Sequence, residues 1–251
     1  MSGDGTKIPS FRFVVATRKT EDEGMDLPVL RFLSLVNLSG SFKVDLDIAY
    51  GNTDGLPTVY NRSIDLDSRD PHDFIVFIHD DIWPSDVFMF DKISEASKDF
   101  DVIGVCGGKG WTQYGDGHTP IIWTHAAKDS GLSGFMAHAA DESSSRVRHD
   151  AAYRGRSVFS TNYGHSPSRT LTIDGCFMCF TRNAVDSGLR FDENFRFHFY
   201  DMDMCFSAYV MKLKVGTAPV LLMHESLGYS VAQPEFLEAQ SRFLAKWFGK
   251  K

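Results

Sequence analysis

The sequence predicts an α/β fold in which a mostly parallel central sheet is flanked by helices. Short apolar runs typical of buried strands alternate with stretches of helical periodicity through the first hundred residues. Alternation at this spacing is typical of a parallel sheet that is covered on both faces. The chain has 251 residues, of which 43% are hydrophobic and 24% charged, so a single domain over 1–251 can bury a sizeable core.

The elements of the first half follow from apolar patterning and from helix start and stop signals. We expect strands over 11–18, 42–52, 73–81 and 101–108, and helices over 25–40, 56–67 and 85–100. Asp26 is a plausible cap of the first helix, with Pro28 in its first turn and Gly40 as its stop. Ser85 is the expected start of the third helix.

Residues 109–172 interrupt this rhythm, since they are rich in Gly, Ser, His and Arg and show little periodicity. Long irregular segments inside a compact domain are functional loops or disordered ones, so we expect a variable acceptor or donor loop region here. Regular structure resumes with a strand over 171–182, a helix over 202–214 stopped near Gly216, a strand over 217–224 and a C-terminal helix within 231–251.

The four cysteines and the net charge narrow the class of protein. All four lie in apolar, strand-like or helix-like contexts: Cys106, Cys176, Cys179 and Cys205. The pair at 176 and 179 has zinc-ligand spacing, but no matching second pair follows, and on a strand these positions point to opposite faces. Reduced core cysteines predict a cytoplasmic location. The net charge of −7 argues against a nucleic-acid partner.

The stretch "DFIVFIHDDIW" over 73–83 reads as a buried strand that ends in His79, Asp80 and Asp81. In an open parallel sheet, ligands bind beyond the carboxyl ends of the strands. Two adjacent carboxylates repel each other unless a cation or a donor lies between them. Hard oxygen ligands favour Mg²⁺ or Mn²⁺, bound together with substrate phosphates. The alternative is a solvated turn before the next helix.

Two further segments offer groups for proton transfer or metal binding. Asp201 and Asp203 begin a helix, directly after Phe199 and Tyr200. Aromatic surroundings raise a carboxylate pKa and suit Asp201 to be a general base, whereas Asp203 is equally well explained as a helix cap. His224 stands where an apolar strand ends, as a ligand or as a structural histidine. Three such strand or loop ends together are hard to explain by packing.

The order of these segments resembles the GT-A-fold glycosyltransferases, a Rossmann-like fold of nucleotide-diphospho-sugar transferases, and in particular the inverting family 2. The segments that carry the resemblance are "VVATR", "LPTVYNRSI", "FIVFIHDDIW", "VIGVCGG", "DGCFMCFTRNAV", "LRFDENFRFHFYDMDMCFSAY" and "VLLMHES". They cover 11–230, with 109–172 unmatched. The block "FDENF…YDMDMC" followed by a strand-end histidine is the most specific part.

The resemblance implies a donor site at the strand ends. "HDD" takes the place of the family's DxD motif, so that Asp81 binds the metal that bridges the donor diphosphate and His224 is a further ligand. His79 replaces the usual first Asp, and with Asp80 it would contact the nucleotide sugar. The positions that contact the nucleoside in the family correspond to Thr17, Arg18 and Asn52.

The resemblance also implies an acceptor side. Tyr200 and Asp201 align with the family's Glu-Asp pair, which makes Asp201 the base for the acceptor hydroxyl and Tyr200 a departure from the pattern. Asp174 is a plausible acceptor contact. Trp123 could be a platform for a sugar ring or an anchor of the loop, as could Trp111 and Tyr114.

The implied activity is a metal-dependent, inverting transfer of a sugar from a UDP-, GDP- or dTDP-linked donor to a glycan or glycoconjugate, with Mn²⁺ or Mg²⁺ as cofactor. One alternative is a sugar-1-phosphate nucleotidyltransferase, although "ATRKTEDEG" after the first strand has only one glycine. Another is a non-catalytic sugar-binding domain of the same fold. The roles of two basic regions are left open by the sequence. One is a loop patch that either closes over phosphates or is simply solvated, and the other is a C-terminal helix that either contacts a membrane or packs on the domain. The patch consists of Arg146, Arg148, Arg154 and Arg156.

Overall fold

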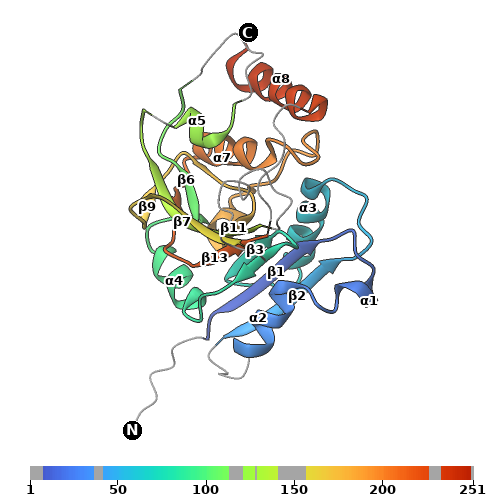
Figure 1. Ribbon diagram of the computed structural model, residues 1–251. Coiled ribbons are helices and arrows are strands. Elements are labelled where there is room, and N and C mark those ends of the chain that lie inside the picture. Colours follow the sequence, from blue (N-terminus) through green and yellow to red (C-terminus); the bar gives the residue numbers. More distant parts are fainter. Residues whose placement is uncertain are drawn as a thin grey trace.

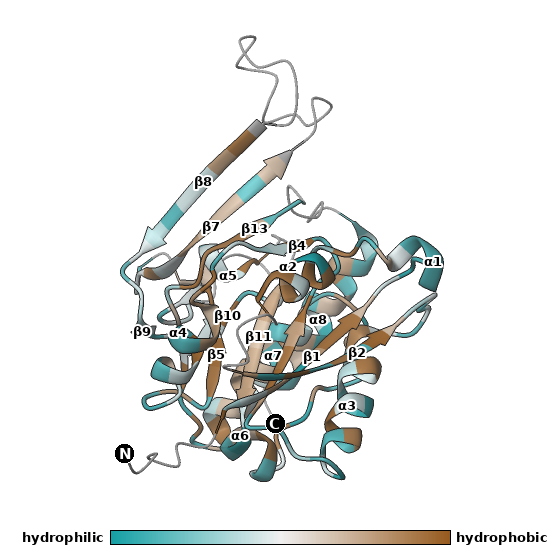
Figure 2. Cartoon of the chain, turned by 90° about the horizontal axis from the view of Figure 1, so that it is seen from below, coloured by the Kyte–Doolittle hydropathy of each residue, from teal (hydrophilic) through white to brown (hydrophobic). Residues whose placement is uncertain are grey.

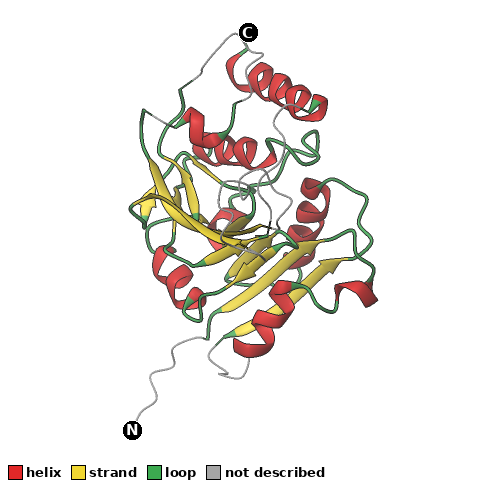
Figure 3. Cartoon of the chain, in the orientation of Figure 1, coloured by secondary structure: helices red, strands yellow, loops and turns green. Residues whose placement is uncertain are grey.

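A computed structural model describes residues 8–36, 42–112, 121–127, 129–140, 157–225 and 233–249, which form a mixed α/β structure (Figures 1 and 3). The helices are α1 (Glu21–Gly24), α2 (Pro28–Val36), α3 (Leu56–Asp67), α4 (Met89–Ala96), α5 (Trp123–Ala126), α6 (Arg182–Asp186), α7 (Tyr200–Val210) and α8 (Pro234–Phe248). The strands are β1 (Ser10–Ala16), β2 (Lys43–Ala49), β3 (Phe74–Ile78), β4 (Ile82–Pro84), β5 (Val102–Gly104), β6 (Cys106–Gly108), β7 (Leu132–Ala140), β8 (Ser157–Gly164), β9 (Ser168–Arg169), β10 (Thr172–Ile173), β11 (Phe177–Thr181), β12 (Val215–Thr217) and β13 (Leu222–His224).

The first sheet is mixed, so the expectation of a mostly parallel sheet is wrong. Its order is β2-β1-β3-β11-β5-β12-β9. Strand β1 is parallel to β2 and β3, but β11 runs antiparallel to both β3 and β5. Phe177, the first residue of β11, pairs with Ile78, the last residue of β3, so β11 begins where β3 ends and runs back along it. The turn that precedes β11 is thereby brought to the carboxyl end of β3.

Both faces of this sheet are covered, which explains why all five residues of β3 are buried. On one face, Phe11 and Phe13 of β1 contact Phe90 of α4. On the other face, Phe77 of β3 contacts Tyr60 of α3. Successive strand residues point to opposite faces, so an uninterrupted apolar run is what a strand between two helical layers requires.

The second sheet has the order β10-β6-β7-β13-β4, and β8 pairs with β7. Strands β7 and β8 extend away from the body of the molecule as an antiparallel arm (Figure 2). The expectation of an irregular loop over 109–172 is therefore wrong for 132–140 and 157–164, which form these two strands. Small residues such as Gly134 and Ala137 hide the alternation of β7, and Gly134 has a φ of 107° at a register shift between β7 and β8.

Several expected boundaries differ. Helix α4 begins at Met89, and the Ser85 hydroxyl donates to the Trp83 carbonyl instead of capping the helix. Helix α7 ends at Val210, and Gly216 lies within β12. Asp26 forms an ion pair with Arg31 two residues before α2 begins. Two positions of the sequence analysis lie in undescribed stretches together with the basic loop patch: Gly40 and Tyr114.

Three expected strands are each divided in two. The segment 101–108 forms β5 and β6, 171–182 forms β10 and β11, and 217–224 is divided between β12 and β13. In each case the chain leaves one sheet and enters the other. The four cysteines are buried and free, as expected.

Helix α8 packs on the domain through both apolar and charged groups. Phe243 is fully buried and contacts Phe199 and Phe206. Asp203 of α7 is also fully buried, and it accepts hydrogen bonds from Lys246 Nζ at 2.9 Å and Trp247 Nε1 at 2.8 Å. Burial raises the Asp203 pKa, and these two bonds offset part of that effect. Among the described residues, no helix is long and apolar enough to cross a membrane.

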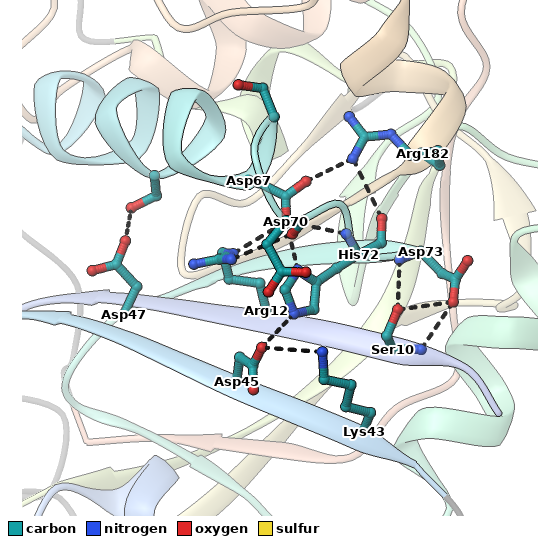
Figure 4. A network of polar contacts seen from close by, with 12 residues as sticks. Ser10, Arg12, Lys43, Asp45, Asp47, Asp67, Asp70, His72, Asp73 and Arg182 are labelled. Atoms are coloured by element: carbon teal, nitrogen blue, oxygen red, sulfur yellow. Dashed lines mark hydrogen bonds and ion pairs between the residues drawn. The ribbon is translucent and has the colours of Figure 1, made fainter.

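A group of charged residues lies at the amino ends of β1, β2 and β3 (Figure 4). We call it the amino-end cluster, and it comprises Arg12, Asp45, Asp67, His72 and Arg182. Asp67 is fully buried and accepts hydrogen bonds from Arg12 Nε at 3.1 Å, His72 Nδ1 at 2.8 Å and Arg182 at 2.6 Å. These bonds compensate the desolvation of the Asp67 carboxylate.

Candidate functional site

Three metal-ligating side chains meet at the other end of the sheet, and we call them the carboxyl-end cluster: His79, Asp81 and His224. Each offers one ligand atom, and these atoms lie within 4.8 Å of one another. Two of them follow β3, where a turn is closed by the Ile82 N–H donating to the His79 carbonyl at 3.3 Å. The third ends β13, where His224 pairs with Ile82 in the antiparallel ladder. The strand ends thus converge as the sequence predicts.

Two polar atoms of the carboxyl-end cluster are buried without a hydrogen bond: Asp81 Oδ1 and His224 Nε2. His224 Nε2 approaches Asp81 Oδ2 to 3.3 Å as an ion pair. Burial opposes the charge of both groups, but their mutual contact outweighs it, so the pKa of Asp81 is lowered and that of His224 is raised. Unsatisfied buried oxygen and imidazole nitrogen atoms at this spacing fit a divalent cation.

The third member, His79, is bonded to a buried tyrosine. His79 Nε2 lies 2.8 Å from the Tyr200 hydroxyl, which itself donates to the Gly175 carbonyl at 2.8 Å. Tyr200 is 3% exposed. Burial lowers the His79 pKa, which favours the neutral ring. A Cβ at position 175 would collide with the Tyr200 hydroxyl, so glycine is required there.

Asp201 lies in the first turn of α7, next to the same glycine. Its Oδ2 accepts from the Gly175 N–H at 3.0 Å, and its Oδ1 accepts from the Met202 N–H at 2.8 Å. Burial and the negative charge of Asp174 raise the Asp201 pKa to about 7, despite these bonds. The residue before α7, Phe199, has a φ of 65°, an uncommon conformation for an aromatic residue that concentrates at functional sites.

Asp174, next to Gly175, is held as a carboxylate. Its oxygens accept from the Cys176 N–H at 3.0 Å and from Trp123 Nε1 at 2.9 Å. Burial opposes the charge, but the backbone bond, the charge of His224 and the indole bond outweigh it and lower the Asp174 pKa. Trp123 is only 8% exposed and packs against Tyr163, so it acts on this site as the hydrogen-bond donor that orients Asp174.

Of the three residues expected to contact the nucleoside, Thr17 and Asn52 are hydrogen-bonded to each other, whereas Arg18 is exposed. The Thr17 hydroxyl donates to Asp80 Oδ2 at 2.6 Å, which links the ends of β1 and β3. The Asn52 N–H donates to the Thr17 carbonyl at 2.8 Å, while its side chain closes a local turn with Asp54. Arg18 is exposed at the same edge of the sheet.

Two residues beside the site escaped the sequence analysis. Gly175 accepts a hydrogen bond from Tyr200, the partner of His79, and donates one to Asp201, so it links the two residues. The only signal of this role in the sequence was its place between two polar side chains in "DGC". His138 of β7 pairs with His224 in the parallel ladder, and their rings lie 6.2 Å apart. The strand that carries His138 lay in the segment expected to be irregular.

No protein-family model matches the chain, and no curated protein does. Solved structures match only distantly. The crystal structure of A197 from STIV has a TM-score of 0.45 at 9% identity, covering 84% of this chain and 82% of that one. The catalytic domain of Drosophila β1,4-galactosyltransferase 7, solved with xylobiose, has a TM-score of 0.43 at 8% identity, with 84% and 65% covered.

A third structure, S. aureus TarS, has a TM-score of 0.46 at 12% identity. The match covers 94% of this chain, which spans 39% of the TarS chain. None of these similarities is close enough to assign an activity to this chain. An activity therefore has to be inferred from the geometry of the site.

Proposed function

We propose that this protein is a metal-dependent glycosyltransferase that moves a sugar from a nucleoside-diphosphate donor to a hydroxyl of a glycan or glycoconjugate, with inversion at the anomeric carbon. The observation that carries the proposal is the meeting of two different chemical groups at one sheet edge. One is the carboxyl-end cluster, which has unsatisfied ligand atoms. The other is Asp201, a carboxyl whose pKa of about 7 suits a general base.

The donor side follows from the strand ends. Thr17 and Asp80 are hydrogen-bonded to each other beside Asn52, which gives the nucleoside polar groups at the carboxyl ends of β1, β2 and β3. Asp81 and His224 would hold a divalent cation, Mn²⁺ or Mg²⁺, which when bound neutralises charge on the departing diphosphate. Arg18 is exposed at the same edge and free of the packed core, in reach of solvent-borne phosphates.

The acceptor side follows from Asp201 and its neighbours. The acceptor hydroxyl gives its proton to the Asp201 carboxylate while its oxygen forms a bond to the anomeric carbon. The bond from that carbon to the diphosphate oxygen breaks, and the electron pair leaves with the diphosphate. Since this displacement has one step and no covalent enzyme intermediate, the anomeric configuration inverts. Asp174, oriented by Trp123, offers the acceptor a second carboxylate.

The test is calorimetric titration of UDP, GDP and dTDP into the full chain, each with and without Mn²⁺, on wild type and Asp81→Ala. Tight binding of one nucleotide that needs both the metal and Asp81 supports the proposal. If no nucleotide binds under any condition, the proposal fails. A transfer assay with the corresponding sugar donors then separates an enzyme from a sugar-binding domain, because Asp201→Ala abolishes turnover only in an enzyme.

A further inference from the structure

The bond between His79 and Tyr200 determines which nitrogen of His79 can bind a metal. The Tyr200 hydroxyl has a single proton, and it points to the Gly175 carbonyl, which can only accept. With that proton committed, the hydroxyl can only accept from His79 Nε2, 2.8 Å away. Both bonds form together only when Nε2 of the neutral His79 ring carries its hydrogen.

No solvent partner competes for this arrangement. Tyr200 is 3% exposed, and its ring lies within the hydrophobic core next to Tyr60 and Phe191. The ring of His79 is further held by stacking on Phe197 at a centroid distance of 6.1 Å. The tautomer of His79 is therefore fixed by packing and by two hydrogen bonds in series.

With the hydrogen on Nε2, the lone pair of His79 is on Nδ1. Nε2 is committed to Tyr200, so a bond from His79 to a metal in the carboxyl-end cluster has to be made by Nδ1. A histidine that donates its second ring N–H to a fixed oxygen is the usual arrangement of a metal ligand, because the bond sets both the tautomer and the ring orientation.

We propose that His79 is a third protein ligand, through Nδ1, and that the site selects a transition-metal dication over Mg²⁺. The inference rests on the proposed function for the presence of a metal, and goes beyond it in the ligand set and the metal class. Two imidazoles and one carboxylate suit Mn²⁺, Fe²⁺, Co²⁺ or Zn²⁺, whereas Mg²⁺ prefers oxygen ligands only. Tyr200 is a positioning residue that acts through His79.

The experiment is direct metal binding to the full chain, with Mn²⁺, Co²⁺ and Mg²⁺ titrated calorimetrically with and without UDP, and Co²⁺ followed by visible absorption. Two variants test the ligand and its support. His79→Phe keeps a ring on Phe197 and removes the nitrogen, and Tyr200→Phe removes only the hydroxyl. The matched control is Tyr209→Phe, the same change at an exposed position of α7.

We expect wild type to bind Co²⁺ at least about 100-fold more tightly than Mg²⁺, with the affinity for Mn²⁺ between the two, in keeping with the affinity order and ligand preferences of these ions. His79→Phe should weaken Co²⁺ binding about 100-fold and change its absorption bands, and Tyr200→Phe should weaken it about 10-fold. Tyr209→Phe should bind as wild type does. Equal affinity for Co²⁺ in wild type and His79→Phe, or binding of Mg²⁺ as tight as that of Mn²⁺, would overturn the inference.

The two proposals fail in different ways. If metals bind in the His79-dependent manner but no nucleotide binds, the ligand assignment stands and the glycosyltransferase function does not. If a nucleotide binds with Mg²⁺ and Mn²⁺ alike, independently of His79, the function stands and the ligand assignment does not. Failure of every metal to bind, with or without UDP, overturns the ligand assignment.

Discussion

Two groups of histidines and carboxylates lie at opposite ends of the same strands, and they differ in whether their polar atoms have partners. In the amino-end cluster, the buried Asp67 carboxylate accepts from two arginines and a histidine (Figure 4). In the carboxyl-end cluster, Asp81 Oδ1 and His224 Nε2 are buried without a hydrogen bond. The first group is complete as a structural ion network, whereas the second keeps two buried ligand atoms without a hydrogen bond.

Spacing alone does not separate the two. Asp45, Asp70 and His72 also have ligand atoms within 4.8 Å of one another. However, both ring nitrogens of His72 face carboxylate oxygens, Nδ1 toward Asp67 at 2.8 Å and Nε2 toward Asp45 at 2.7 Å. Both ring nitrogens of His72 therefore already have a partner inside the amino-end cluster, whereas Asp81 Oδ1 and His224 Nε2 have no hydrogen bond. Buried atoms without a hydrogen bond, and not the spacing of ligand atoms, distinguish the candidate metal site.

The largest effect should come from Asp201→Asn at the carboxyl end. Loss of the general base should lower kcat by about 10³-fold, within the usual range for such a group. The measurement is the initial rate of sugar transfer with the donor identified by calorimetry. A kcat within a factor of about 3 of wild type would show that Asp201 is not the base.

The same variant should gain stability at high pH. Because the folded-state pKa of Asp201 is raised to about 7, the folded protein holds this proton more tightly than the unfolded chain does. The resulting stabilisation is present at low pH and is lost as the pH rises toward that value. Asn cannot ionise, so Asp201→Asn should melt at a higher temperature than wild type at pH 8, and a lower melting temperature there would contradict the raised pKa.

Asp67→Asn and Asp81→Asn form a matched pair that tests the comparison directly. Asp67→Asn removes the charge that compensates buried partners, so it should cost about 3–5 kcal/mol of unfolding free energy. It should leave kcat unchanged at temperatures where the protein stays folded. Asp81→Asn should lose metal-dependent nucleotide binding and cost less stability than Asp67→Asn, because Asp81 has one ion-pair partner, His224, and is partly exposed. Urea unfolding and calorimetry measure both, and equal stability losses in the two variants would remove the distinction.

Added Mn²⁺ should stabilise the folded protein through the carboxyl-end cluster only. At 100 times its dissociation constant, a ligand that binds only the folded state adds about 2.7 kcal/mol. The rise in melting temperature with Mn²⁺ should disappear in Asp81→Asn and persist in Asp45→Asn, a change in the amino-end cluster. Persistence in Asp81→Asn would place the metal elsewhere.

The smallest effect is on the pH profile. If Asp201 acts as a carboxylate base, kcat/KM should fall about tenfold per pH unit below the Asp201 pKa and level off above it. With that pKa at about 7, the bend should lie near neutrality. A bend near pH 4, the ordinary range of an aspartate, would show that burial and Asp174 do not act on Asp201 as described.

The parts of the fold that follow from local pattern were predictable. The strand β3 is an uninterrupted apolar run that ends in charged groups; its burial is confirmed, and the residues that follow it lie in the carboxyl-end cluster. Helix α3 has the bounds expected from its periodicity, Leu56–Asp67, and helix α8 (Pro234–Phe248) lies within the expected 231–251. In each case the signal lies within about ten neighbouring residues.

The parts that depend on contacts between distant residues were not predictable. The antiparallel direction of β11 is set by its pairing with β3, about a hundred residues earlier in the chain. The bond between His79 and Tyr200 joins residues 121 apart, and each alone looked like a departure from a family pattern. Strand β7 carries small residues and a left-handed glycine, so its alternation is too weak to be seen in one sequence.

Helix α8 supports the helix that carries Asp201, although it contributes no residue to the proposed reaction. Its Lys246 and Trp247 hold the buried Asp203, two residues after Asp201 on the same helix. A chain shortened before Pro234 would leave the Asp203 carboxylate without its two donors, next to Asp201, the proposed general base. Helix α7 would then have to shift or to take up water at its first turn. Chain truncation at this end should therefore abolish sugar transfer before it abolishes folding.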